Sequence, residues 1–129
     1  MKIVFVGPLP PPISSGQTQA NFALLEYFQR RHEVKFIDTT TVRHITDHSE
    51  TGRMSIRRLI PSFNAIFVGI PRIFFSYRVH VLYITPAQSF LGFLKYVPFM
   101  WMARVRGIPC FIHIHGGYFR TMYNGLRGW

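Results

Sequence analysis

In this 129-residue sequence, the side chains best suited to catalysis or ligand binding are two histidines in the stretch 111-FIHIHGGYFR-120. His113 and His115 alternate, so on an extended strand they point to the same face. A metal site would need further ligands, and the sequence has no Asp or Glu after Glu50. We therefore expect no metal and no cofactor. We also expect His113 to be a buried histidine whose hydrogen bonds are satisfied.

His115 differs from His113 because the sequence places it at the last position of a strand, directly before Gly116 and Gly117. A histidine there can present its ring to a substrate, and the two glycines let the backbone come close to a ligand. The alternative is that His115 only hydrogen-bonds the loop. No paired carboxylates accompany it, which disfavours glycosidase chemistry, and no arrangement of serine, cysteine and histidine indicates nucleophilic catalysis.

A second glycine-containing loop follows the apolar run 2-KIVFV-6, which is typical of a buried strand. This loop, Gly7 to Gln17, is rich in proline and leads into a predicted helix, whose N-terminus would suit an anion such as phosphate. Neither G-x-G-x-x-G nor G-x-x-x-x-G-K-[ST] occurs, which disfavours dinucleotide oxidoreductases and P-loop NTPases. Ligands bind beyond the carboxyl ends of parallel strands. We therefore expect this loop and the segment from His115 to Arg120 to border a ligand site.

Predicted strands and helices alternate along the chain. The strands are predicted at four apolar runs, over residues 2–6, 33–38, 80–85 and 109–115. Helices are predicted over residues 16–31 and 88–106, and the segment 54–77 has a helix-like mix of residues. Apolar strands that alternate with helices are typical of an α/β fold. We predict a Rossmann-like parallel sheet covered by helices on both faces.

Serine and proline positions indicate where the helices begin and break. Ser14 stands three residues before Gln17, as in a capping box at the start of the first helix. The helix over 88–106 is expected to be broken or kinked near Pro98. The last dozen residues, YFRTMYNGLRGW, show no closing element, and we expect the domain to be incomplete at this end.

The charge is strongly unbalanced. Lys and Arg total 15 against 5 acidic residues, and no acid occurs from Thr51 to Trp129, where ten Lys or Arg remain. This excess indicates an anionic partner, such as nucleic acid, anionic lipid or a phosphorylated substrate, or else acids on a partner chain or a further domain. Cys110 is the single cysteine, so no intrachain disulfide can form, which fits a cytoplasmic protein. No apolar run reaches the ~20 residues that a spanning helix needs.

The stretch 2-KIVFVGPLPPPISSGQTQANFALLEYF-28, together with 111-FIHIHGGYFR-120, resembles the N-terminal domain of bacterial glycosyltransferases of family 4. These GT-B enzymes have two facing Rossmann-like domains, and the similarity covers essentially all 129 residues. The resemblance implies that residues 1–129 form a single acceptor-side domain. It also implies that a donor-binding domain, with its basic pair and its Glu-x7-Glu motif, is missing.

The resemblance further implies a retaining transfer of a sugar from a nucleotide-sugar to a lipid-linked or cell-envelope acceptor, without a metal. The first loop would approach the donor diphosphate, and the histidine would lie by the transferred sugar. The residues so placed are His115 as the catalytic residue, and Ser15, Gly16, Gln17, Gly116, Gly117 and Arg120 as substrate-binding residues. Many relatives have two adjacent glycines in the first loop, where this chain has Ser15-Gly16.

Two other interpretations remain open. The net charge of +10, with interleaved Tyr and Phe, also suits a non-enzymatic basic module that binds nucleic acid or an anionic membrane. Against nucleic acid, the basic residues are scattered and no nucleic-acid-binding motif occurs. The other interpretation is an inert truncated remnant.

A peripheral contact with the inner face of an anionic membrane is also expected, near a lipid-linked acceptor. The residues expected to make it are Arg57, Arg58, Arg72 and Arg78, with the phenylalanines around them. The alternative is that these aromatic residues belong to the core and that the arginines are simply solvated.

Overall fold

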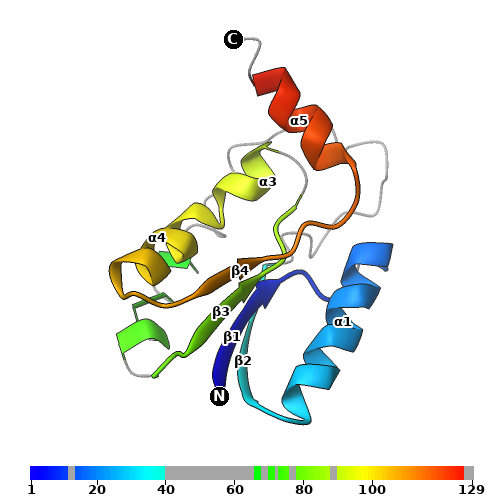
Figure 1. Ribbon diagram of the computed structural model, residues 1–129. Coiled ribbons are helices and arrows are strands. Elements are labelled where there is room, and N and C mark those ends of the chain that lie inside the picture. Colours follow the sequence, from blue (N-terminus) through cyan, green and yellow to red (C-terminus); the bar gives the residue numbers. More distant parts are fainter. Residues whose placement is uncertain are drawn as a thin grey trace.

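The computed structural model describes residues 1–11, 14–39, 66–67, 70–71, 73–75, 78–87 and 90–126. Within them, all strands pair in parallel and form a single sheet in the order β2-β1-β3-β4, with helices on both sides (Figure 1). The strands are β1 (Lys2–Gly7), β2 (Glu33–Asp38), β3 (Val81–Ile84) and β4 (Cys110–Ile112). The predicted α/β fold with a parallel sheet is therefore confirmed.

The helices follow the strands in alternation. They are α1 (Gly16–Gln29) after β1, α3 (Phe90–Leu94) and α4 (Val97–Val105) between β3 and β4, and α5 (Tyr118–Leu126) after β4. None of the helices in the described ranges is long and apolar enough to cross a lipid bilayer. Most of the segment 54–77, for which a helix-like character was predicted, lies outside the described residues.

The order of the strands reverses next to β1. The chain passes from β1 through α1 to β2 on one side, and β3 then adds to the other side of β1. The last residues of β1 and β3 are neighbours, because Val6 is paired with Ile84. In open parallel sheets this switch point, beyond the carboxyl ends of the strands, is the place where ligands bind.

The face of the sheet toward α1 is built from aromatic residues. Phe5 of β1 lies with its ring centroid 5.3 Å from that of Tyr83 of β3 and 5.8 Å from that of Phe36 of β2. Phe28 of α1 packs edge-on against Tyr83, at 5.3 Å. Strand residues alternate between faces, so Phe5 and its neighbours in register turn the same way and hold α1 against the sheet.

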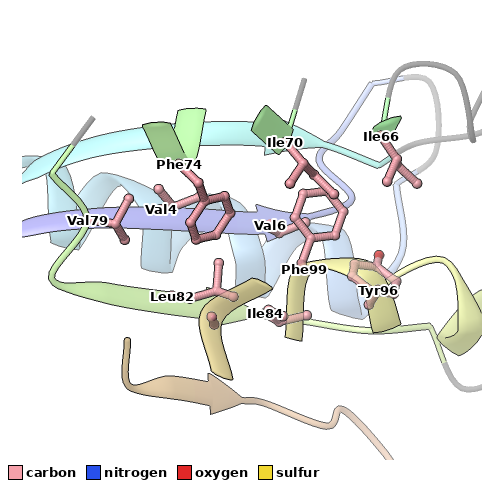
Figure 2. Packing of buried hydrophobic residues seen from close by; sticks show 11 residues of the cluster. Val4, Val6, Ile66, Ile70, Phe74, Val79, Leu82, Ile84, Tyr96 and Phe99 are labelled. Atoms are coloured by element: carbon pink, nitrogen blue, oxygen red, sulfur yellow. The ribbon is translucent and has the colours of Figure 1, made fainter. Parts of the chain in front are cut away.

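The opposite face carries the aliphatic core. Val4 and Val6 of β1 are fully buried there, and Figure 2 shows Phe74 and Ile70 packed over them. Phe99 of α4 belongs to the same buried cluster. Removing a buried ring of this kind typically costs ~3–5 kcal/mol, so Phe99 contributes substantially to holding α4 against the sheet. Helices thus cover both faces of the sheet, as predicted.

The N-cap of α1 is Ser15, and the prediction of Ser14 is wrong by one residue. Ser15 has an extended backbone, its hydroxyl accepts a hydrogen bond from the N–H of Thr18, and the Thr18 hydroxyl accepts one from the N–H of Ser15. This reciprocal pair is a capping box that uses Thr in place of Glu or Gln. Ser14 instead accepts a hydrogen bond from the amide of Gln19.

The helix predicted over 88–106 is broken near Pro98, as predicted, with the break at Lys95 and Tyr96. Pro98 lies in the first turn of α4, where its missing N–H would have had no partner within the helix. The expectation that the last dozen residues form no element is wrong, because α5 occupies Tyr118–Leu126. Tyr118 or Phe119, Met122 and Leu126 recur at helical spacing, so the signal for α5 was present in the sequence.

β4 is shorter than predicted. It ends at Ile112, so His115 does not occupy the last position of a strand. The backbone N–H of His113 still donates to the carbonyl of Ile84, at 2.8 Å, and this bond extends the pairing with β3 by one residue. His115 therefore lies in the connection between β4 and α5, where its position depends on tertiary contacts.

Candidate functional site

A buried polar cluster closes the switch point between β1 and β3. The side-chain amide of Asn21, on α1, donates to the carbonyl of Pro8 and to the hydroxyl of Thr85, both at 2.9 Å. Asn21 and Thr85 are fully buried. Oδ1 of Asn21 is buried and has no hydrogen-bond partner among the residues that the structure describes. The cluster ties the first loop, α1 and the end of β3 together.

Gly7 makes this cluster possible. A Cβ at Gly7 would overlap the hydroxyl of Thr85 and would lie 3.2 Å from the amide nitrogen of Asn21. Glycine is therefore needed here for space, because the side chains of α1 and of the residue after β3 meet directly above it. Neither Asn21 nor Thr85 was predicted from the sequence to be a site residue. Asn21 is a polar residue on the side of α1 that faces the sheet, and this position in the sequence could have indicated a buried polar contact.

The first loop keeps its three predicted site residues together at the start of α1. Ser15 is exposed and caps the helix, and Gly16 is exposed with nothing within 4 Å of the position a Cβ would take. Gln17 turns inward, and its amide donates to the carbonyls of Thr85 and Pro86, at 3.4 and 3.2 Å. Gln17 therefore fastens the start of α1 to the end of β3, whereas Gly16 leaves open space beside the backbone at the start of the helix.

The N-terminus of α1 is electrostatically suited to an anion. The first turns of helices leave N–H groups without helical partners and carry a partial positive charge. No acidic residue occupies the first turn of α1 or of α5. Both helices follow strands of the parallel sheet, so both begin at its carboxyl edge (Figure 1).

His113 is held by β3. Its Nδ1 lies 2.7 Å from the hydroxyl of Tyr83, and the two rings meet edge to face. Tyr83 is in turn stacked on Phe5, at 5.3 Å between centroids. The prediction that His113 has a satisfied hydrogen bond is confirmed, although the side chain is only partly buried.

The ring of His115 stacks on that of His113, with the centroids 4.1 Å apart and the planes inclined by 26°. The two side chains therefore lie on the same side of the chain, as their alternation predicted. Burial, and secondarily the neighbouring His113, lower the pKa of His115 below its ordinary value of 6.5. Its imidazole is consequently neutral at neutral pH, with one N–H donor and one acceptor nitrogen.

The turn after His115 leads directly into α5. Gly116 has φ +82°, in the left-handed region that glycine adopts without strain. Gly117 is exposed with open space around its Cα, and its carbonyl accepts from the N–H of Arg120 in the first turn of α5. The side chain of Arg120 is exposed. Gly116 and Gly117 thus turn the chain from β4 toward the helix within two residues.

Both predicted segments are attached to β3. Gln17 reaches the two carbonyls that follow this strand, and His113 bonds to Ile84 and Tyr83 within it. The first loop and the His-Gly-Gly turn therefore lie at the same edge of the sheet, as predicted.

A second polar cluster, at the end of β2, was not identified from the sequence. Nζ of Lys95 donates to the carbonyl of Thr39, at 2.9 Å, and the Thr39 hydroxyl lies 2.6 Å from that of Tyr96. Burial lowers the pKa of Lys95 to about 8, an effect that the charge of Asp38 opposes. Burial also raises the pKa of Tyr96 to about 12. These contacts fix the break between α3 and α4.

Within the described ranges, no group of three or more His, Cys, Asp or Glu side chains is placed to hold a metal ion. Burial raises the pKa of the Cys110 thiol, which makes it a poorer nucleophile. Comparison of the chain with protein-family models, with curated proteins and with solved structures finds no match.

Proposed function

We propose that this chain is the acceptor-side half of a retaining GT-B glycosyltransferase, which moves a sugar from a nucleotide-sugar to a lipid-linked or cell-envelope acceptor. The observation that carries the proposal is the placement of the open start of α1 and of the His115 turn at one edge, on either side of the end of β3. The parallel sheet and its switch point support this proposal, because such edges bind ligands.

The donor diphosphate would lie at the start of α1. Backbone N–H groups and the helix dipole favour an anion there, and no carboxylate in the first turn opposes it. The open space around Gly16 would let a phosphate oxygen approach the backbone. Gln17 would act as a positioning residue, because its side chain is engaged with the carbonyls after β3.

His115 would bind a hydroxyl of the transferred sugar. A neutral imidazole suits this role because it offers one donor and one acceptor without attracting the diphosphate away from α1. In the transfer, the bond from the anomeric carbon to the diphosphate breaks, and a bond to the acceptor oxygen forms on the same face. The acceptor proton passes to the departing diphosphate. The chain contributes positioning and electrostatic stabilisation, and no protein nucleophile is required.

The reaction needs a donor-binding domain in addition to residues 1–129, on the same polypeptide or on a second chain. The natural gene product should therefore be purified from the cells that make it, and its intact mass compared with 15.1 kDa. It should then be incubated with labelled nucleotide-sugars and a lipid extract of the same cells. We expect labelled glycolipid from at least one donor. Absence of transfer from every nucleotide-sugar would contradict the proposal.

The variant His115→Ala tests the site within the same assay. We expect it to lose transfer by roughly 100-fold or more, as for other residues that position charge and substrate. Its thermal unfolding should stay close to that of the wild type. His32→Ala is the matched control, because His32 directly precedes β2 at the opposite edge of the sheet. If His115→Ala and His32→Ala transfer sugar equally fast, His115 takes no part in the mechanism.

A further inference from the structure

The outward sides of α3 and α4 carry exposed apolar residues, which form an apolar stripe on each helix with a break at Lys95 and Tyr96. Phe90, Leu94, Val97, Trp101 and Val105 recur at every third or fourth residue, and all of them are exposed. Trp101 and Val105 are the most open, at 64% and 65% of their full accessible surface. These five residues, together with Phe75, are called the α3–α4 surface below.

Phe75 extends the stripe beyond the end of α4. It is 77% exposed, and the guanidinium of Arg106 lies 5.9 Å from the centre of its ring. Arg106 directly follows α4, so this contact places Phe75 beside the C-terminus of the helix. An exposed Phe and an exposed Trp at one surface indicate an interaction site more strongly than isolated apolar residues do.

The inner side of α4 is apolar as well. Phe99 and Ala103 are buried in the core against the sheet (Figure 2 labels Phe99). A helix on the outside of a domain normally carries polar residues on its outward side. The α4 helix has only Arg104 as a charged residue, so its outward side is suited to a second apolar environment.

The exposed charges on α4 and directly after it are basic, although the carboxylate of Asp38 acts on Lys95 at the break between α3 and α4. Arg104, Arg106 and Arg78 are exposed, and the sequence contains no Asp or Glu from Thr51 to its end. A second copy of the chain would bring these like charges together and would be repelled. An anionic lipid surface offers the complementary combination, because its headgroups attract arginine and its acyl boundary accepts Trp, Phe and Leu.

We propose that the α3–α4 surface docks on an anionic lipid bilayer, with the apolar stripes in the headgroup region and Arg104 and Arg106 paired with lipid phosphates. The sequence had assigned membrane contact to Arg57, Arg58 and Arg72, which lie outside the described residues, and to Arg78. The α3–α4 surface includes Phe75, one of the phenylalanines around Arg72 and Arg78, but its other apolar residues lie on α3 and α4. It does not depend on the proposed glycosyl transfer.

Sedimentation of the full chain with vesicles tests the proposal. We expect binding to phosphatidylcholine vesicles that contain roughly 30% phosphatidylglycerol, and at least tenfold weaker binding to pure phosphatidylcholine at about 0.15 M salt. Trp101→Ser together with Val105→Ser should weaken binding roughly tenfold or more. The matched control is Phe22→Ser on α1, which removes an exposed aromatic residue from the opposite face of the sheet.

The contribution of the two arginines to membrane binding is tested by the double variant Arg104→Gln, Arg106→Gln. We expect this pair to lose roughly tenfold or more in affinity for the anionic vesicles, since each arginine near a lipid surface contributes about fivefold. Arg30→Gln with Arg31→Gln, at the end of α1, removes the same charge from another exposed place and should have much less effect. Equal losses in both pairs would show non-specific attraction only and would overturn the proposal.

Tryptophan emission gives a second readout that needs no variant of the surface. In a Trp129→Phe background Trp101 is the only tryptophan, and its emission should shift to the blue when anionic vesicles are added. An emission maximum that is already blue and does not change would mean that protein covers the surface. Light scattering without vesicles would then identify a second copy as the cover if it reports a dimer. Either result would overturn membrane docking.

Discussion

The imidazole rings of His113 and His115 stack 4.1 Å apart, although the strand that precedes them has already ended. Tyr83 holds His113 through its hydroxyl, so the stack is anchored to β3. A ring that is stacked and partly buried resists protonation, particularly beside a second imidazole. The position and the charge of His115 are thus set by a neighbour two residues away and by a strand about thirty residues upstream.

We expect His115 to titrate below 6.5 in NMR spectra of the imidazole protons, because burial disfavours its charged form. The variant His113→Phe keeps a ring in the stack and removes its charge. The pKa of His115 should therefore rise in this variant, yet stay below 6.5, because burial is the larger cause of the shift. An unchanged pKa would show that the neighbouring imidazole has no electrostatic influence.

The two glycines of the first loop should respond differently to a methyl group. In Gly7→Ala the new Cβ overlaps the Thr85 hydroxyl, so we expect a loss of roughly 1–3 kcal/mol in the free energy of unfolding. In Gly16→Ala nothing lies within 4 Å of the new atom, and stability should change by less than about 0.5 kcal/mol. Urea denaturation of both variants measures this contrast. Equal stabilities would mean that Gly7 is not needed for space.

Gly16 also offers a test of ligand approach that is separate from folding. The larger variant Gly16→Val should fold, because the position is open, but its side chain would stand where the donor diphosphate is proposed to lie. We expect a higher KM for the nucleotide-sugar in the natural gene product, with stability near that of the wild type. Unchanged donor kinetics would remove the start of α1 from the donor site.

The hydrogen bond between Asn21 and Thr85 should be measurable as a coupling energy. Asn21→Ala removes donors from the Pro8 carbonyl and the Thr85 hydroxyl, and we expect it to cost about 2–4 kcal/mol. In a double-mutant cycle with Thr85→Val, the interaction term should be about 1 kcal/mol. Gln19→Ala, at an exposed residue of α1, is the control and should have little effect. Strict additivity in the cycle would contradict a direct bond.

Lys95 should make stability depend on pH above neutrality. Its pKa is about 8 in the folded chain and about 10.5 in the unfolded chain. Between these values the unfolded chain holds a proton that the folded chain has released, so the contribution of Lys95 to stability rises with pH. We expect the stability difference between wild type and Lys95→Met to shift in favour of the wild type from pH 7.5 to about 9.5. Lys35→Met, at an exposed lysine, controls for the loss of one charge.

Much of the fold was predictable because its signals are local. The segment 33-EVKFID-38 has a strand-like pattern that can be read locally, and the strand predicted there matches β2 residue for residue. The start of α1 at Gly16 was also predicted correctly, and its end was predicted within two residues. The prediction failed where neighbouring residues have nearly the same local preference for a position. Ser14 and Ser15 are adjacent serines, and only the extended backbone at Ser15 selects the cap.

By itself, the sequence determined the parallel α/β arrangement, the start of the first helix at Gly16, and the excess of basic residues over residues 51–129. Only the tertiary structure decided that Asn21 meets Thr85, 64 residues away, and that His113 lies against Tyr83. The physical reason is that strand and helix preferences are local properties of the backbone. Contacts between distant side chains depend instead on strand register and on how far each strand continues, which are decided when the elements pack together.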